Sequence, residues 1–254
     1  MRRRNFSASL TLFAILPSSV FAETGDETKF DLIIIGIGAA GLSTAVSAAQ
    51  NGVKNILLID KAAFVGGHSA LSGGSVNAVV PELQMKQGIK DSPEFWQRQI
   101  METGEFQSDP VLVNTLVNNA QSTLHWLREI GISFDDQVFE AWGGKFQRAH
   151  SAGQKRSGMT YVRIMNHKAR SLSVKVRLRT EAVNLLEKDG QVMGVRVKDR
   201  NGKLTDLEAK DVVIATGGFT ANVAMRLKYD SRFDASLFTT ANQTGRGFDG
   251  STGD

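Results

Sequence analysis

The stretch Phe30-Asp-Leu-Ile-Ile-Ile-Gly-Ile-Gly-Ala-Ala-Gly41 decides the fold class of this chain. Its first half is a short apolar run that ends at Gly36, a pattern typical of a strand buried on both faces. Residues 39–52 follow with a helix-forming composition and end in Asn-Gly, a favourable C-terminal cap. Asn55-Ile-Leu-Leu-Ile-Asp60 is a second apolar run. The sequence therefore predicts strand, helix and strand by residue 60, and an α/β fold.

The glycines of this stretch have the spacing Gly36-x-Gly38-x-x-Gly41, and Asp60 lies 24 residues after the first of them. The first glycine permits a tight turn, the second lets the backbone approach a pyrophosphate, and the third allows close packing of helix on strand. The helix N-terminus offers amides and a positive dipole end to phosphates. Asp60 is placed to accept hydrogen bonds from an adenosine ribose. The pattern predicts dinucleotide binding, and by itself it leaves FAD and NAD open.

The rest of the chain continues the α/β pattern. We expect a Gly/Ser-rich loop over 64–77, then helices that start at Ser92-Pro93 and at Asp109-Pro110, and a helix over 163–172. The apolar spacing of the second of these helices is that of Leu112, Leu116, Leu124 and Leu127. Residues 174–207 are strand-rich with two Gly-containing turns, and 211–218 form another apolar run that ends in glycines.

Composition excludes several classes of protein. Of the 254 residues, 41% are hydrophobic and 22% charged, which is typical of a globular chain and not of a disordered one. The absence of cysteine excludes disulfides, thiolate zinc sites, iron–sulfur clusters and covalent c-type haem from this polypeptide, and we predict no metal site. The net charge of +4 includes three arginines near the N-terminus, without which 27 basic residues face 26 acidic ones. Nucleic acid is therefore not an expected partner.

Residues 1–22 are predicted to be an export signal. Arg2-Arg-Arg4 precedes an apolar stretch up to Leu16, and Val20-Phe-Ala22 offers small residues at a cleavage site. The segment Arg3-Arg-Asn-Phe6 matches the core of a twin-arginine signal, with a general secretory signal as the alternative. No stretch is long enough for a membrane span. We expect an exported, periplasmic mature protein.

Further motifs occur in a fixed order along the chain. Lys61 follows Asp60, then comes Gly66-Gly-His-Ser69 with Gly73-Gly74, later Thr180-Glu-Ala-Val-Asn, and finally Ala215-Thr-Gly-Gly218. From Phe30 to Asp254 this order resembles the fumarate reductase and succinate dehydrogenase flavoprotein superfamily, most of all its soluble exported flavocytochrome c-type fumarate or urocanate reductases. The resemblance implies a Rossmann-like FAD-binding domain over 23–254, with a parallel sheet, flanking helices and a β-meander, that precedes a capping and substrate domain.

The resemblance implies a set of FAD contacts distributed over the whole chain. These are Gly36, Gly38, Ala40 and Gly41 at the pyrophosphate, Asp60 at the ribose with Lys61 beside it, Gly67, His68, Ser69, Gly73 and Gly74 against the flavin and ribityl chain, Val183 or its neighbour Ala182 at the adenine, Ala215, Thr216 and Gly217 along the dinucleotide, and Asp254 at the flavin.

The four histidines are predicted to differ in role. His68 falls where membrane-bound members of the superfamily bond covalently to the flavin, whereas soluble members have Asn, so we expect a hydrogen-bonding His68 and non-covalent FAD, with covalent attachment as the alternative. His125 is predicted to pack within its helix and His167 to be solvated. Arg148 and His150, expected in a loop, are candidates for a structural or substrate-side role.

The resemblance also implies a reaction. Members of the superfamily transfer a hydride from reduced flavin to the double bond of an unsaturated acid such as fumarate, and an external donor such as a cytochrome supplies the electrons. Their catalytic acid and carboxylate-binding residues follow the Gly-Asp-Gly motif that Gly253-Asp254 begins, so we expect this sequence to be an N-terminal part with an incomplete FAD domain. The alternatives are a non-catalytic flavin-binding or electron-carrier module, a ketosteroid-type flavin dehydrogenase, and a nicotinamide-dependent dehydrogenase.

Overall fold

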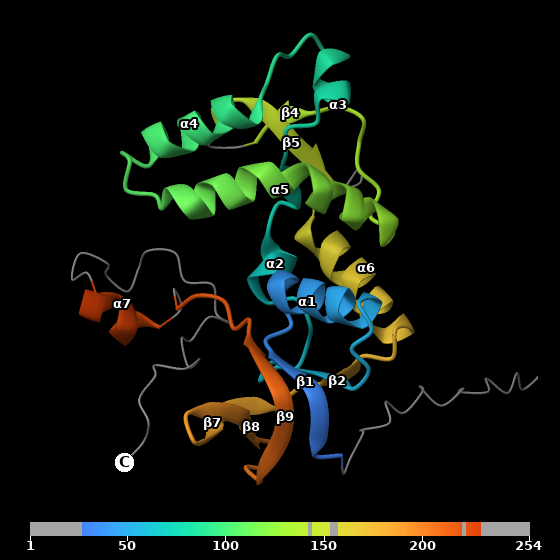
Figure 1. Ribbon diagram of the computed structural model, residues 1–254, viewed down its shortest axis with the longest axis vertical. Helices are drawn as coiled ribbons and strands as arrows, with labels where there is room; N and C mark the ends of the chain where they lie inside the picture. Colours follow the sequence, from blue (N-terminus) through green and yellow to red (C-terminus); the bar gives the residue numbers. More distant parts are fainter. Residues whose placement is uncertain (1–26, 142–143, 153–156, 220–221, 230–254) are drawn as a thin grey trace, which may run out of the picture.

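A six-stranded sheet forms the base of the molecule in the computed structural model, which describes residues 27–141, 144–152, 157–219 and 222–229 (Figure 1). Its strand order is β6-β2-β1-β9-β8-β7. The first four strands in this order are parallel, and β9, β8 and β7 form an antiparallel meander. The strands are β1 (Lys29–Ile35), β2 (Ile56–Ile59), β6 (Lys175–Arg177), β7 (Glu181–Lys188), β8 (Gln191–Lys198) and β9 (Leu204–Ile214).

The two apolar runs found in the sequence are the central strands. Ile34 of β1 is paired with Leu58 of β2 on one side and with Val213 of β9 on the other. Ile34 and Leu58 are fully buried, as expected for parallel strands covered on both faces. This confirms the predicted strand–helix–strand unit, with α1 (Ala39–Gln50) as the crossover.

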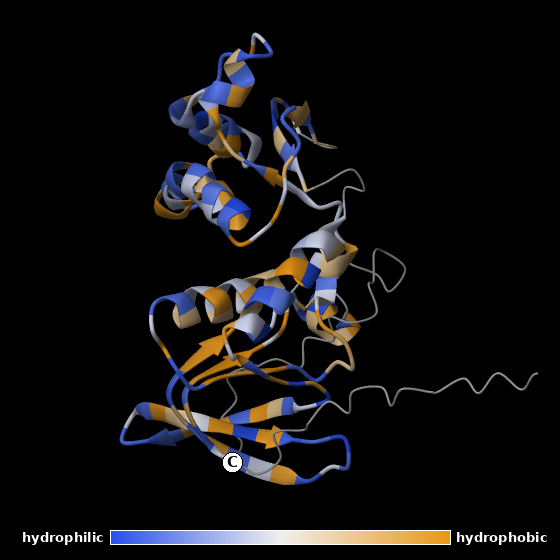
Figure 2. Ribbon diagram, turned by 90° about the vertical axis from the view of Figure 1, so that its right-hand side faces the viewer, coloured by the Kyte–Doolittle hydropathy of each residue, from blue (hydrophilic) through white to orange (hydrophobic). Residues whose placement is uncertain are grey.

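Each face of the sheet is covered by a different part of the chain. Helices α1 and α6 (Gly158–Ser171) pack together over one face, where Leu42, Val46 and Val162 are fully buried. On the other face Ile33, Leu57 and Ile59 pack against Val195 and Leu207 of the meander. In Figure 2 the hydrophobic colouring follows β1 and β2 where they run beneath the helices. The sheet core is therefore assembled from residues that are as far apart in the sequence as Ile33 and Leu207.

A second layer of elements, which we call the helical lobe, consists of residues 75–151. It contains β3 (Ser75–Asn77), α3 (Pro81–Met85), α4 (Pro93–Thr103), α5 (Pro110–Glu129), β4 (Phe139–Glu140) and β5 (Gln147–Ser151). The three strands form an antiparallel sheet in the order β3-β5-β4. In Figure 2 the helical lobe lies at the end of the molecule opposite the meander.

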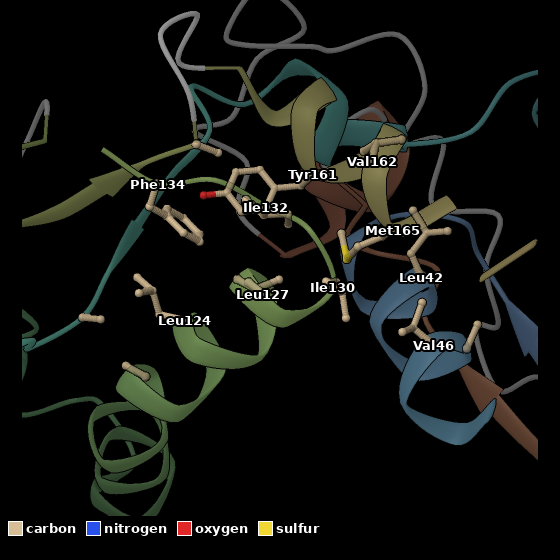
Figure 3. Packing of buried hydrophobic residues seen from close by; sticks show 14 of the residues in the cluster. Leu42, Val46, Leu124, Leu127, Ile130, Ile132, Phe134, Tyr161, Val162 and Met165 are labelled. Carbon is tan, nitrogen blue, oxygen red and sulfur yellow. The ribbon is translucent and has the colours of Figure 1, made fainter. Parts of the chain in front are cut away.

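One continuous hydrophobic cluster joins the helical lobe to the sheet. Figure 3 shows Leu124, Leu127 and Ile130 facing the residues that cover the sheet. Met165 of α6 lies between Ile130 and Leu42 of α1, and Tyr161 of α6 lies beside Phe134 and Ile132. This cluster fixes how the end of α5 sits against α6 and α1.

Several sequence-based boundaries need correction. The predicted loop over 64–77 contains the short helix α2 (Gly67–Leu71) and strand β3, because β3 pairs with the distant β5. Helix α6 begins five residues before the predicted Arg163. The run 211–218 begins inside β9, which continues from the meander without a break.

The apolar spacing read from the sequence of α5 follows its buried face only in the second half of the helix. Leu112 and Leu116 are 68% and 55% exposed, and Val113 and Val117 are buried in their place. The buried residues Val113, Val117, Ala120, Leu124 and Leu127 are three or four positions apart, so they share one face of the helix, and Leu112 and Leu116 lie to one side of it.

Within the described ranges, no helix is both long and apolar enough to cross a membrane. The predicted export signal over 1–22 and the predicted flavin contact Asp254 lie outside the described residues.

Candidate dinucleotide site

The turn between β1 and α1 has room only for glycine at two of its three motif positions. Gly36 has φ +108°, and a Cβ there would lie 2.3 Å from the carbonyl oxygen of Ala215. A Cβ on Gly41 would lie 1.9 Å from the carbonyl oxygen of Gly36. A side chain at either position would therefore collide with backbone, which cannot retreat as a flexible side chain does. The geometry agrees with the tasks that the sequence assigns to the first and third glycines.

The N-terminus of α1 presents free amides to the edge of the sheet. The amide of Ala39 donates to Ser69 Oγ at 2.9 Å. The amides of Ala40 and Gly41 have no acceptor among the described residues. A Cβ on Gly38 would meet nothing nearer than Ser69 Oγ at 3.5 Å, so this glycine is not required by protein packing. The open space in front of two unsatisfied amides suits a phosphate.

Asp60 lies at the end of β2, where its carboxylate organises the adjoining backbone. Oδ2 accepts the amide hydrogen of Ile37 at 2.9 Å, and Oδ1 accepts that of Ala62 at 2.9 Å. The carbonyl oxygen of Asp60 accepts from the amide of Thr180 at 2.9 Å. Each carboxylate oxygen has a further lone pair that can accept from a ribose hydroxyl. Asp60 therefore holds the glycine turn in place as well as facing the predicted adenosine end.

The Gly/Ser-rich segment is folded tightly against α1 and α6. Gly67 and Gly74 have φ +48° and +68°, and a Cβ on Gly74 would lie 2.4 Å from the carbonyl carbon of Ser157. Gly73 is exposed and has open space around it. The Nε2 atom of His68 is buried without a hydrogen-bond partner among the described residues. This ring nitrogen is therefore able to form a hydrogen bond with a ligand.

The remaining predicted contacts lie on β7 and after β9. A register shift between Ala182 and Asn184 leaves Val183 without a Cα partner on β8, so a bulge occurs where the adenine contact is predicted. The amide of Ala215 donates to the carbonyl oxygen of Ile35 at 2.8 Å. Thr216 and Gly217, with φ +76° at Gly217, are exposed. The structure thus places the predicted residues that it describes at or near one edge of the sheet, where parallel strands end.

One contributor to this site was not found from the sequence. Ser157 caps α6 by accepting the amide of Met159, and Gly158 follows it. A Cβ on Gly158 would lie 1.9 Å from the carbonyl oxygen of Ser69, and its amide donates to the carbonyl oxygen of Ser72 at 2.9 Å. The signal in the sequence that indicates this contact is the Ser-Gly pair directly before an amphipathic helix. It marks the point where α6 supports the segment that carries His68 and Ser69.

Arg148 and His150 lie in strand β5 and not in a loop as predicted, and both are buried in the helical lobe. Arg148 forms two hydrogen bonds to Asp91, from Nε to Oδ2 at 2.9 Å and from Nη2 to Oδ1 at 2.8 Å. His150 Nε2 lies 3.1 Å from the carbonyl oxygen of Ala78. These contacts support a structural role for both residues. The prediction that His125 packs is wrong, since it is exposed on α5, whereas the exposure of His167 confirms its solvation.

His150 makes stability sensitive to acid. Burial is the main cause that lowers the pKa of His150 below its ordinary value, with Arg128 acting in the same direction and the contact with Ala78 and the charge of Glu82 opposing it. Unfolded His binds a proton near pH 6.5, whereas folded His150 stays neutral to lower pH, so the unfolded state binds more protons in this window.

We therefore expect the free energy of unfolding to fall as the pH drops below about 6.5, by up to about 1.4 kcal/mol per pH unit. Denaturant titrations between pH 5 and 7 measure this slope. His150→Leu should flatten it, whereas His125→Gln, on an exposed helix face, should leave it unchanged. Equal slopes in all three proteins would contradict the assignment to His150.

The residues present fit a flavin dinucleotide at this edge. Three observations support this fit: the open space at Gly38, the two free amides of α1, and the buried His68 Nε2 without a partner among the described residues. The residues concerned extend from the N-terminus of α1 to the α2 segment. A glycine-rich turn with only a structural role would involve the β1–α1 connection alone.

Comparison with known proteins identifies the family. Residues 31–251 match the FAD binding domain family, and the chain belongs to it. FAD is therefore its cofactor, which favours FAD over NAD for the glycine motif. The fold is that of the fumarate reductase flavoproteins, as predicted.

Two relatives and one solved structure show the range of this similarity. The chain is 32% identical to the fumarate reductase (cytochrome) of Shewanella frigidimarina, over 87% of this chain and 38% of the relative. It is 32% identical to the urocanate reductase of Eggerthella lenta, over 86% and 36%. A flavocytochrome c3 fumarate reductase in its open conformation superposes with a TM-score of 0.80 at 30% identity, over 88% of this chain and 40% of that one. The chain spans less than half the length of each of these proteins.

Proposed function

We propose that this chain is the FAD-binding part of an exported reductase that acts on the carbon–carbon double bond of an unsaturated acid such as fumarate. The observation that carries the proposal is the glycine turn of β1 and α1 packed on Ala215, within a chain similar to a fumarate and a urocanate reductase. When bound, the flavin supplies the hydride. An external donor such as a cytochrome supplies electrons, and the predicted leader at residues 1–22 supports a periplasmic location.

The residues of this chain bind and orient the cofactor. The free amides of Ala40 and Gly41 donate to the pyrophosphate, and Asp60 accepts from the ribose hydroxyls. Val183 and Ala182 offer main-chain groups to the adenine, and Ala215, Thr216 and Gly217 line the dinucleotide on the neighbouring strand. Ser69 links the α2 segment to α1 through the Ala39 amide. The segment with Gly67, Gly73 and Gly74 then lies against the flavin, and Lys61 adjoins Asp60. The flavin contact predicted for Asp254 lies outside the described residues.

Asp60→Ala should weaken FAD binding by about 10- to 150-fold, because a hydrogen bond to a charged acceptor contributes about 1.5–3 kcal/mol. The substitution also releases the amide of Ile37, so the turn that carries the free amides is less ordered. Quenching of flavin fluorescence measures the dissociation constant. Asp60→Asn keeps one acceptor oxygen and should bind with intermediate affinity. Unchanged binding in the alanine variant would remove Asp60 from the site.

FAD is expected to bind without a covalent bond to His68. Acid precipitation of the yellow protein should leave the flavin in the supernatant, because His68 Nε2 then serves only as a hydrogen-bonding partner. His68→Asn should retain the cofactor with a similar affinity. Flavin that stays in the pellet of the parent protein and not of His68→Asn would instead establish His68 as the attachment point.

The substrate class is tested with the complete coding sequence that contains these residues. Oxidation of reduced methyl viologen is followed after addition of fumarate, urocanate or a saturated analogue. Turnover with an unsaturated acid, and none with succinate as acceptor, is the expected result. A flavin-loaded protein that reduces no unsaturated acid would contradict the proposal and favour a flavin-binding or electron-carrier module.

A further inference from the structure

An open pocket of about 270 Å³ lies at the carboxyl edge of the sheet, between the end of β2 and the hairpin of β7 and β8. Its lining residues are Lys61, Arg179, Glu181, Lys198, Asp199 and Arg200. Of these only Lys61 belongs to the predicted FAD contacts. Four of the six lining residues are cations, so the pocket is suited to an anion.

Both carboxylates of the pocket already have partners within the protein. Glu181 forms an ion pair with Lys198 at 2.7 Å. Asp199 Oδ1 accepts the amides of Asn201 and Lys203 at 2.8 and 2.9 Å, and so closes the turn between β8 and β9. Glu181 is thus neutralised by Lys198, whereas the two amides stabilise the carboxylate of Asp199 without cancelling its charge. Because four cations line the pocket with two carboxylates, its net charge and its potential are positive.

Arg179 is held at the pocket by strained backbone. Its φ is +52°, in the left-handed region that costs a non-glycine residue about 1 kcal/mol or more. Its amide donates to the carbonyl oxygen of Ala62 at 2.9 Å, and the amide of the next residue donates to Asp60. This conformation ties Arg179 to the segment that follows β2.

Strand β6, which ends just before Arg179, carries two other basic residues that have partners. Lys175 contacts Glu27 and donates to Asn55 Oδ1 at 2.8 Å, and Arg177 donates to the carbonyl oxygen of Glu27 at 2.7 Å. Arg179 forms no side-chain hydrogen bond or ion pair among the residues that the structure describes. Of this basic row, two members stabilise the sheet, and the third is exposed at the pocket with its guanidinium available.

We propose that this pocket binds a phosphate group, at a site separate from the pyrophosphate contacts at the N-terminus of α1. The guanidinium groups of Arg179 and Arg200 at an open pocket match the charge and the several acceptor oxygens of a phosphate. A volume of about 270 Å³ also leaves room for bridging water molecules. The phosphate is either free or carried by a nucleotide. The site does not depend on the proposed reductase activity.

Calorimetric titration of the full chain with inorganic phosphate, at constant ionic strength in a phosphate-free buffer, tests the proposal. We expect saturable binding that Arg179→Asn weakens at least tenfold. Asparagine tolerates the left-handed conformation, so this variant should keep the thermal stability of the parent. Arg200→Gln should weaken binding similarly, whereas Lys54→Gln, an exposed cation on the α1–β2 connection, is the matched control.

Two further titrations separate the sources and the sites. The affinities for 5′-AMP and for phosphate are compared with FAD at saturation. If 5′-AMP binds more tightly than phosphate, and this difference is lost in Arg179→Asn, the site binds the phosphate of a nucleotide. Equal affinities identify free phosphate as the ligand. Phosphate binding that is absent, or that is unchanged in both arginine variants, would overturn the proposal. Loss of FAD binding with phosphate binding retained would count against the flavin site alone.

Discussion

Gly41→Ala is expected to abolish FAD binding and to lower the free energy of unfolding by about 3 kcal/mol, at the upper end of the range for overpacking. Its Cβ would lie 1.9 Å from the carbonyl oxygen of Gly36, so either α1 moves away from β1 or the turn opens. Both movements displace the free amides of Ala40 and Gly41. Denaturant unfolding and flavin fluorescence measure the two effects.

Gly38→Ala is the matched comparison that separates the fold from the cofactor. The nearest atom to its Cβ is Ser69 Oγ at 3.5 Å, an ordinary contact, so the fold should keep its stability. The new methyl group occupies space in front of the α1 N-terminus and should still weaken FAD binding by at least tenfold. If Gly38→Ala binds FAD as the parent does, the pyrophosphate does not lie against this turn.

Arg148→Met should destabilise the protein by roughly 3–5 kcal/mol, because it leaves the fully buried carboxylate of Asp91 without its cation. The guanidinium also lies 4.9 Å from the Phe146 ring centroid and 5.3 Å from that of Trp96, so its removal opens the packing of the helical lobe. Gln84 Nε2, which donates to Asp91 Oδ2 at 2.8 Å, is the one other side chain recorded as a donor to this carboxylate among the described residues. Chemical denaturation measures the loss.

The double variant Asp91→Leu/Arg148→Met is the control for this prediction. Replacing a buried ion pair by apolar side chains of similar volume is often neutral, so the double variant should recover much of the lost stability. FAD affinity should stay close to that of the parent in every folded variant, since neither residue lies at the glycine turn. A single variant as stable as the parent would show that the pair contributes little.

The sheet and the glycine site were predictable from the sequence because their signals are local. The isoleucines of residues 33–35 and the Gly36–Gly41 spacing specify a buried strand, a tight turn and a helix within twelve residues. Asp60 was predictable from its position after the second strand. The double role of its carboxylate was not, since the bonds to Ile37 and Ala62 depend on how the turn closes.

The helical lobe was less predictable because its contacts are long-range. Strand β3 forms only because Val76 lies opposite His150, more than seventy residues later. From the sequence Arg148 is expected in a loop. In the structure it is buried by its ion pair with Asp91 and by the surrounding aromatic rings. Helix α5 was correctly placed, but which of its apolar residues face inward depends on α6 and α1.

Binding of FAD by the full chain, followed by the visible spectrum after gel filtration, tests the central claim most directly. The account predicts a folded protein that carries flavin absorbance through the column and releases the flavin on acid precipitation. Gly41→Ala, run in parallel, should elute colourless. A folded parent chain that elutes without flavin after incubation with excess FAD would contradict the assignment of the β1–α1 turn as a flavin dinucleotide site.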